Sequence, residues 1–287
     1  MMDPKTLVKD LDQLVSLPDV CIRVNHLMGS GNYSSAQVAE IISQDADISA
    51  RLLRVVNSSF YGLPTKIETL SRAITIVGAD DLRNLVMAAT AMRTFTGIPK
   101  QLVDMTEYWQ HSVTTGVMAQ SLAKYSNVLH SERLFVMGLL HDIGRLVIYL
   151  TLAEKATDVL YITGGDNWIL PQTESEVIGF THLDVGAELM RSWGLPESFA
   201  AVAGYNNRPQ EAGDYQLETS LVHIAKAIAN GEMVGLNIQE MLWAIDPFAW
   251  QMTGLTPDVV SPMIDEMVAK SDEALSLITP QYKQAFA

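Results

Sequence analysis

The sequence has little of several features that mark whole classes of protein. A single cysteine, Cys21, excludes a disulfide framework and is typical of a protein kept in a reducing cytoplasm. Basic residues are scarce: 19 Lys and Arg stand against 33 Asp and Glu, which gives a formal net charge of −14. No basic run interrupted by aromatic residues occurs. Because nucleic-acid binding needs clustered basic side chains, we expect no nucleic-acid partner.

Long hydrophobic runs are also missing. The apolar stretch at 134–140 is far shorter than the roughly 20 residues that a helix needs to cross a bilayer. The N-terminal segment MMDPKTLVKDLDQL lacks the apolar core of a signal peptide. We therefore expect a cytoplasmic protein without a membrane partner.

What the sequence does contain is helical periodicity. Val20, Val24 and Met28 form one apolar stripe, and similar stripes recur along the 287 residues. Runs that alternate with period two, as in half-buried strands, are not found. With 48% hydrophobic residues the chain is long enough for a large core and for two or more subdomains. The predicted fold class is all-α.

The chain divides at the segment IPKQLVD. We predict an N-terminal helical part over 1–98, a second helical part over 99–230 and a C-terminal helical extension over 231–287. The second part should contain one helix over 108–124, another over 132–150, and a third that Thr181 and Asp184 begin with capping-box spacing. In NSSFYGLP, the aromatic pair Phe60 and Tyr61 contacts either the other half of the molecule or a partner.

The stretch GLLHDIGRLVIYL, residues 138–150, places polar side chains inside an apolar helix. An unpaired buried polar group costs about 2–7 kcal/mol, so His141 and Asp142 must have partners. His111 shares an inward stripe with Met118 about thirty residues upstream, and Gly138 lets a neighbouring helix approach closely. Two histidines and a carboxylate from two helices could hold one metal ion.

These motifs carry a family resemblance. HSVTTGVMAQSLA followed by GLLHDIGRL resembles the HD superfamily of metal-dependent phosphohydrolases. Four further stretches make the resemblance more specific, because together they resemble the HDOD family, the HD-related output domain of bacterial signalling proteins. These stretches are LVSLPDVCIRVNHLM, IISQDADISARLLRVVNSSFYGLP, IETLSRAITIVGADDLRNLV and ESEVIGFTHLDVGAELMRSWGLPESFAAVAGYNNRP. The resemblance covers about residues 11–209.

The resemblance implies a multi-helix HD-like bundle with an N-terminal helical subdomain and a C-terminal extension. It also implies metal ligands at His111, His141 and Asp142. His182 falls where cyclic-di-GMP phosphodiesterases of the HD-GYP type have a ligand histidine. The ion would be Fe, Mn, Zn or Ni, since histidine and carboxylate ligands suit all four.

The chain departs from the ligand pattern at three positions. Asn206 and Asn207 stand where those phosphodiesterases carry two histidines, and Lys226 stands where the last ligand aspartate belongs. An amide is a poor transition-metal ligand and an ammonium is none. We infer that Lys226 replaces the metal as counter-charge to Asp142. A shift of one turn in this alignment would make His223 the inward residue instead.

Each candidate therefore has two interpretations. His111, His141 and Asp142 either bind a metal or form a vestigial polar cluster that keeps helices in register. His182 either is a ligand or caps the helix that it begins. Arg145 either binds phosphate or pairs with a carboxylate. His26 and His130 are assigned no role.

The function expected on balance is a non-catalytic HDOD output module that acts on other signalling proteins. The alternative is a metal-dependent phosphohydrolase acting on a nucleotide or a cyclic dinucleotide. No catalytic residue is assigned and no organic cofactor is expected; a divalent metal ion belongs to the alternative. The sequence names neither the partner protein nor the oligomeric state.

Overall fold

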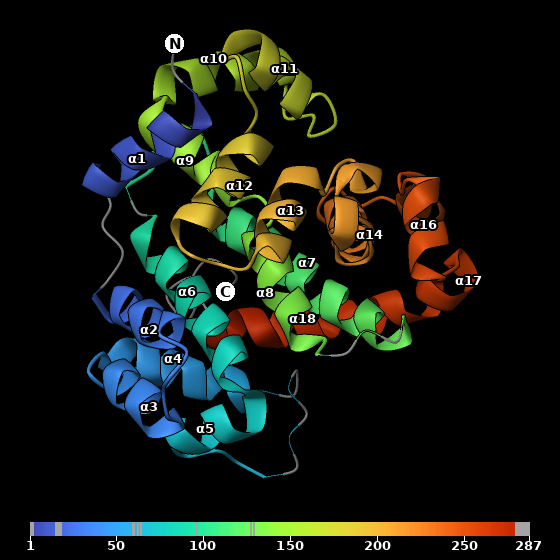
Figure 1. Ribbon diagram of the computed structural model, residues 1–287. Helices are drawn as coiled ribbons and strands as arrows, with labels where there is room; N and C mark the ends of the chain where they lie inside the picture. Colours follow the sequence, from blue (N-terminus) through green and yellow to red (C-terminus); the bar gives the residue numbers. More distant parts are fainter. Residues whose placement is uncertain are drawn as a thin grey trace.

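Figure 1 shows the computed structural model of the protein, which describes residues 3–14, 19–58, 61, 63, 65–95, 97–126, 128 and 130–278. All regular secondary structure within these residues is helical, as predicted. One hydrophobic cluster runs through both halves of the chain and contains Leu52 as well as Trp109 and Phe135. Phe60, for which a contact was expected, lies outside the described residues.

The first part of the chain forms α1 (Pro4–Leu14), α2 (Asp19–Gly29), α3 (Ser35–Ser43), α4 (Ala46–Val56), α5 (Leu70–Val77) and α6 (Ala79–Thr94). Ser34 and Gln37 form a capping box at the start of α3. α2 to α6 pack together in the lower left of Figure 1, and they bury stripes such as Ile48 and Leu52. This layer supports one side of the remaining helices.

The second part begins with α7 (Met105–Tyr125), the longest described helix, which matches the helix predicted over 108–124. α7 crosses α8 (Glu132–Leu140) at two glycines. A Cβ on Gly138 would lie 2.6 Å from the Cα of Gly116, so only glycine permits this crossing. The close approach predicted at Gly138 is confirmed.

The prediction of a single helix over 132–150 was wrong in one respect. The helix ends at Leu140, and α9 (Ile143–Thr151) begins after a turn made by His141 and Asp142. Asp142 has φ −110° and ψ 15°, outside the helical region. At Gly144 a Cβ would lie 2.0 Å from the carbonyl oxygen of His182, so the new direction of α9 depends on glycine. Because the apolar periodicity continues through the turn, the sequence gives no sign of the turn.

The remaining helices complete the bundle around α7 and α8. They are α10 (Ala153–Thr163), α11 (Leu170–Val177), α12 (His182–Ser192), α13 (Glu197–Tyr205), α14 (Gln216–Met233), α15 (Ile238–Trp243), α16 (Pro247–Thr253), α17 (Pro257–Val260) and α18 (Ile264–Ile278). Short 3₁₀ turns at Pro209–Glu211 and Gly213–Tyr215 join α13 to α14, and a third at Ser261–Met263 precedes α18.

The first and last helices each pack against helices that are far from them in the sequence. α1 lies against α12 and α9, and α18 runs along α7 and reaches α4 (Figure 1). Both ends of the described chain thereby hold the two halves together. The division into 1–98, 99–230 and 231–287 stays a prediction.

One stretch, Glu132–Thr151, is long and apolar enough to cross a membrane by length and composition. In the structure 83% of its apolar window is buried inside the protein, and the core helix of a folded protein passes the same test. The turn at His141 and Asp142 also interrupts it. The stretch is the centre of the hydrophobic core.

Candidate functional site

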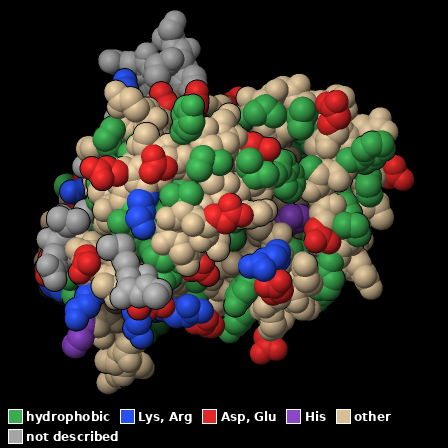
Figure 2. All heavy atoms as spheres, turned by 90° about the horizontal axis from the view of Figure 1, so that it is seen from above, with side chains coloured by type: hydrophobic (Ala, Val, Ile, Leu, Met, Phe, Trp, Pro, Cys, Tyr) green, Lys and Arg blue, Asp and Glu red, His purple; other side chains and the backbone are tan. Residues whose placement is uncertain are grey.

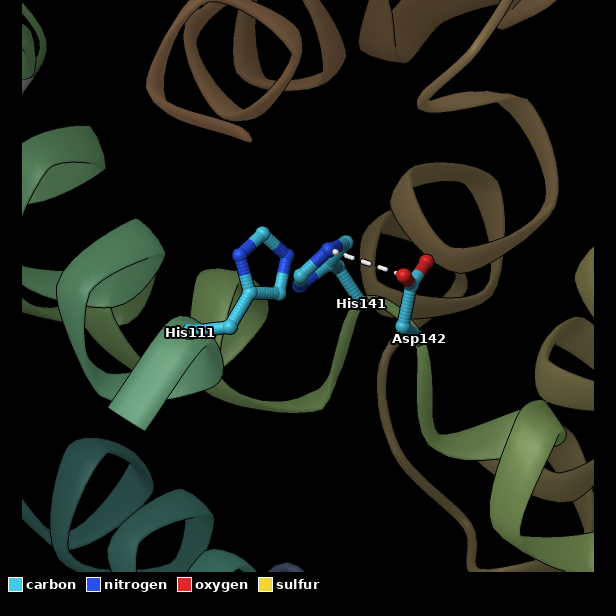
Figure 3. Close-up of side chains that lie close together, drawn as sticks. All are labelled: His111, His141 and Asp142. Atoms are coloured by element: carbon cyan, nitrogen blue, oxygen red, sulfur yellow. Dashed lines mark ion pairs between the residues drawn. The ribbon is translucent and has the colours of Figure 1, made fainter. Parts of the chain in front are cut away.

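The structure brings the seven residues singled out in the sequence into one buried cluster. Figure 3 shows its centre, where His111 of α7 faces His141 and Asp142 at the turn between α8 and α9. The other members come from the start of α12, the end of α13 and the middle of α14: His182, Asn206, Asn207 and Lys226. We call these seven residues the central cluster.

His141 is held in one tautomer by its own helix. Its Nδ1–H donates a hydrogen bond of 2.6 Å to the carbonyl oxygen of Gly138. The other ring nitrogen, Nε2, lies 3.4 Å from Oδ2 of Asp142 and forms no hydrogen bond within the described residues. This is the orientation in which a histidine serves as a metal ligand.

His111 lies beside His141, with 5.2 Å between the ring centroids. Burial and the neighbouring His141 lower the pKa of His111 well below its ordinary value, so the ring is neutral at pH 7. Its Nδ1 is buried without a hydrogen-bond partner. Donor atoms of His111, His141 and Asp142 lie within 4.8 Å of one another, a spacing that could hold a metal ion.

His182 points into the central cluster and does not cap its helix. Thr181 is the N-cap of α12 and forms the predicted capping box with Asp184, which excludes the capping role considered for His182. His182 Nδ1–H donates to Oε2 of Glu174 at 2.6 Å, and its Nε2 lies 3.6 Å from Oδ1 of Asp142. The sequence analysis missed Glu174, a carboxylate only 2% exposed.

The pKa of His182 reflects these two carboxylates. Burial disfavours the charged ring, but Glu174 and Asp142 outweigh it and raise the pKa of His182 above its ordinary value. A protonated imidazole cannot ligate a metal. The two acids thus favour His182 as a hydrogen-bond donor between them.

Lys226 supplies the positive charge of the central cluster. Its Nζ donates to Oδ1 of Asp142 at 3.0 Å, to Oδ1 of Asn206 at 2.8 Å and to Oδ1 of Asn207 at 3.0 Å. An ammonium has three donors, and all three are used. The contact between Lys226 and Asp142 that was expected from the sequence is present. Asn206 and Asn207 are the other two acceptors of the Lys226 ammonium.

The pKa shifts at this pair follow from burial and pairing. Burial raises the pKa of Asp142, but His141 and Lys226 together overcome it and hold that pKa well below its ordinary value. For Lys226, burial lowers the pKa, and Asp142 opposes the effect. Breaking the pair would leave an uncompensated charge in the core.

His223, the alternative inward residue, has a structural role one turn away. Its Nδ1–H donates to the carbonyl oxygen of Asn206 at 2.7 Å, and its Nε2 accepts the backbone N–H of Asp246 at 3.0 Å. Both ring nitrogens are used by backbone groups. The alternative alignment that placed His223 in the cluster was therefore wrong, and Lys226 is the residue that faces Asp142.

Arg145 pairs with carboxylate and phenol groups. Its Nη1 lies 3.7 Å from Oδ2 of Asp142, and its Nε and Nη2 each donate to the hydroxyl of Tyr149 at 3.2 Å. A cavity of about 260 Å³ reaches the surface from Arg145, His111 and Tyr108. Of the two interpretations for Arg145, the contact seen is the one with a carboxylate.

The central cluster does not fit a metal ion as it stands. The Nε2 of His141 is correctly oriented, but Asp142 already accepts from an ammonium, and Arg145 is a second cation nearby. Asp142 is paired with Lys226 and lies near Arg145, and Glu174 is paired with His182, so neither carboxylate lacks a partner. A divalent ion would add two positive charges without a counter-charge. We therefore derive no reaction step through a metal here.

Comparison with known proteins places the chain within one family. The HDOD domain family matches residues 14–209. A protein of Treponema pallidum (strain Nichols), described as uncharacterized, is 25% identical over 221 residues; the match covers 75% of this chain and 42% of that protein. The chain therefore spans less than half the length of this relative.

Two solved structures share the fold over nearly the whole chain. A proposed phosphohydrolase from Shewanella amazonensis SB2B has a TM-score of 0.75 at 23% identity, covering 95% of this chain and 97% of that one. A proposed signal transduction protein from Marinobacter aquaeolei VT8 has a TM-score of 0.66 at 22% identity, covering 91% of this chain and 58% of that one. At these identities the likeness shows the fold alone.

Proposed function

Because this chain belongs to the HDOD domain family, we propose that it is a signal-transduction module that acts in the cytoplasm through contacts with partner proteins and without hydrolysis at its central cluster. The Marinobacter protein of the same fold is itself described as a signal transduction protein. The proposal for this chain rests on its own buried residues.

The observation that carries the proposal is the position of Lys226. Its ammonium donates to Asp142, Asn206 and Asn207, and the resemblance to catalytic HD proteins aligns Lys226 with a ligand aspartate. A metal-bound water, the nucleophile of such relatives, has no ion to activate it while this ammonium stays in place. The central cluster then fixes the relative position of α8, α9, α12 and α14.

Exposed aromatic residues offer points of contact for a partner. Tyr161 at the end of α10 is 89% exposed, Trp168 is 62% exposed, and Trp243 at the end of α15 is 81% exposed. Figure 2 shows one face of the molecule, on which hydrophobic side chains lie between scattered acidic and basic ones. Aromatic side chains of this kind are enriched in protein interfaces.

A second candidate function is hydrolysis of a nucleotide or cyclic dinucleotide with a divalent metal ion. It is favoured by the free Nε2 of His141, by the convergence of His111, His141 and Asp142, and by the cavity that opens onto His111. The Shewanella protein of the same fold is described as a proposed phosphohydrolase.

Metal content decides between the two functions. We would purify the protein without chelator or affinity metal and measure bound metal by elemental mass spectrometry beside the Lys226→Asp and Lys226→Met variants. We expect no ion at the central cluster of the wild type. Lys226→Asp should bind Mn²⁺ or Zn²⁺ about tenfold more tightly or better, since it restores a carboxylate and removes the ammonium.

Lys226→Met is the matched control, because it removes the charge without adding a ligand. A gain in affinity confined to Lys226→Asp supports the counter-charge role of Lys226. The non-catalytic module would be overturned if the wild type bound an ion and turned over a cyclic dinucleotide, and if His141→Ala lost both the ion and the turnover. That result would establish the hydrolase.

A further inference from the structure

We infer that a divalent transition-metal ion binds at Asp81, His130 and Glu132, at a site separate from the central cluster. His130 was assigned no role from the sequence, and it lies with Glu132 in a segment far along the chain from Asp81. We call this group the α6–α8 site.

The residues meet where two helices begin. Asp81 lies in the first turn of α6, and Glu132 is the first residue of α8, with His130 two residues before it. One ligand atom from each of the three side chains lies within 4.8 Å of the others. Small side-chain rotations would bring an imidazole nitrogen and two carboxylate oxygens to one ion.

Two arginines, Arg83 and Arg133, lie near Asp81, but each forms its ion pair with another carboxylate. Arg83 pairs with Asp80 at 3.6 Å, and Arg133 pairs with Glu218 at 2.6 Å. Within the described part of the chain, no basic side chain forms an ion pair with Asp81 or Glu132.

A second, independent observation comes from Asn84, one turn after Asp81 on α6. Asn84 is 4% exposed, and its Oδ1 is buried without a hydrogen-bond partner. Asn84, Asp81 and His130 line the same cavity of about 470 Å³, which Ser198 of α13 also lines. A buried amide oxygen without a donor costs free energy unless something binds it, and a cation is one such partner.

The donor set selects the class of ion. Carboxylate and amide oxygens suit Mg²⁺, Ca²⁺ and Mn²⁺, whereas an imidazole favours transition metals. One histidine with two carboxylates and an amide oxygen therefore points to Mn²⁺ or Zn²⁺. Since His130 is exposed and the cavity opens to solvent, water can complete the coordination.

The α6–α8 site would join the two halves of the chain. Asp81 belongs to the first helical part, while His130 and Glu132 begin the helix whose other end carries His141. The nine residues of α8 span about 13 Å. Metal binding at the α6–α8 site and metal binding at the central cluster can therefore be measured separately.

The test is calorimetric titration of the full chain with Mn²⁺ and with Zn²⁺. We expect one equivalent to bind in the wild type and the affinity to fall about tenfold or more in Glu132→Gln and in His130→Gln. Asp80→Asn is the matched control, because Asp80 lines the same cavity but pairs with Arg83. It should bind as the wild type does, and so should His141→Ala.

Cobalt gives an independent signature, since d–d absorption of bound Co²⁺ should change in His130→Gln. Circular dichroism of each variant verifies that it is folded, which matters most for His130, a residue with φ 57°. Absence of stoichiometric binding would overturn the site. Equal loss in Asp80→Asn and Glu132→Gln would also overturn it, because it would indicate diffuse attraction to acidic groups. Loss in His141→Ala alone would place the ion at the central cluster.

Discussion

At the scale of single residues, the distinctive feature is a buried lysine where a metal ligand is expected. Lys226 is bound by one carboxylate and two amides, and all of its donors are used. Such a pair stabilises little against an apolar replacement of both partners, but removal of one partner is costly. Breaking the Lys226–Asp142 pair is therefore expected to cost more stability than the intact pair contributes.

The first prediction concerns the Lys226–Asp142 pair. Lys226→Met should lower the free energy of unfolding by about 3–5 kcal/mol, because Asp142 stays buried without its counter-charge. Lys226→Met/Asp142→Asn should lose less than the sum of the single variants by about 0.5–3 kcal/mol. Urea unfolding gives these values. Lys270→Met is the control, since Lys270 forms an exposed pair with Glu266 and should change stability by less than about 1 kcal/mol.

The pH dependence of stability follows from the direction of the Asp142 shift. Its pKa is lower in the folded chain than the ordinary 3.8. The folded state thus binds this proton less readily, and the stabilisation is present above about pH 4 and lost as pH falls through the folded pKa. In Asp142→Asn the free energy of unfolding should fall less steeply with acid. Equal slopes in the two proteins would refute the shift.

At the scale of helices, three close approaches between backbones position the central cluster. Gly116 and Gly138 set the crossing of α7 and α8, and Gly144 lets α9 lie against the start of α12. These contacts place His111 against His141 and His182 against Asp142. The geometry of the cluster is therefore a property of helix packing.

Gly144→Ala should be strongly destabilising. Its Cβ would lie 2.0 Å from the carbonyl oxygen of His182 and 2.6 Å from the backbone nitrogen of Gly186, and backbone cannot move aside as a side chain can. We expect a loss of about 3 kcal/mol or more in the free energy of unfolding. Gly29→Ala is the control, because nothing lies within 4 Å of its Cβ. It should be neutral or stabilise by up to about 1 kcal/mol. Similar melting temperatures for both variants would contradict this account.

At the scale of the whole molecule, the two halves share one core and are joined by the terminal helices. α18 lies along α7 and reaches α4, while α1 covers α9 and α12. Ile264 and Met267 of α18 are almost fully buried. The chain should therefore unfold as one cooperative unit.

Ile264→Ala tests this cooperativity. It should cost about 2–5 kcal/mol through the cavity it leaves, and Val259→Ala, at a residue 42% exposed, should cost much less. All five tryptophans lie after residue 104, so fluorescence follows the second part while circular dichroism follows both. We expect coincident urea transitions for the two probes. Separate transitions would show that the halves unfold independently.

Local patterns in the sequence were sufficient to predict some of this structure. Inward stripes identified His111 and His141, and Gly138 indicated a close crossing. The turn at Asp142 was not predictable, because apolar periodicity continues across it. Neither the contact of Glu174 with His182 nor the α6–α8 site has a local signal, since each depends on how separate helices pack. The metal ligands named from the sequence stay predictions.

The three hydrogen bonds of Lys226 also constrain how this chain can change over generations. Restoring an aspartate at 226 by a single substitution would remove the donor that both Asn206 and Asn207 accept from, and it would set two acids side by side in the core. Changing the asparagines first would take two acceptors from a buried ammonium. Each single substitution toward a metal-ligand set should therefore leave a buried charge or a buried amide without its partner, so that such a set requires concerted changes.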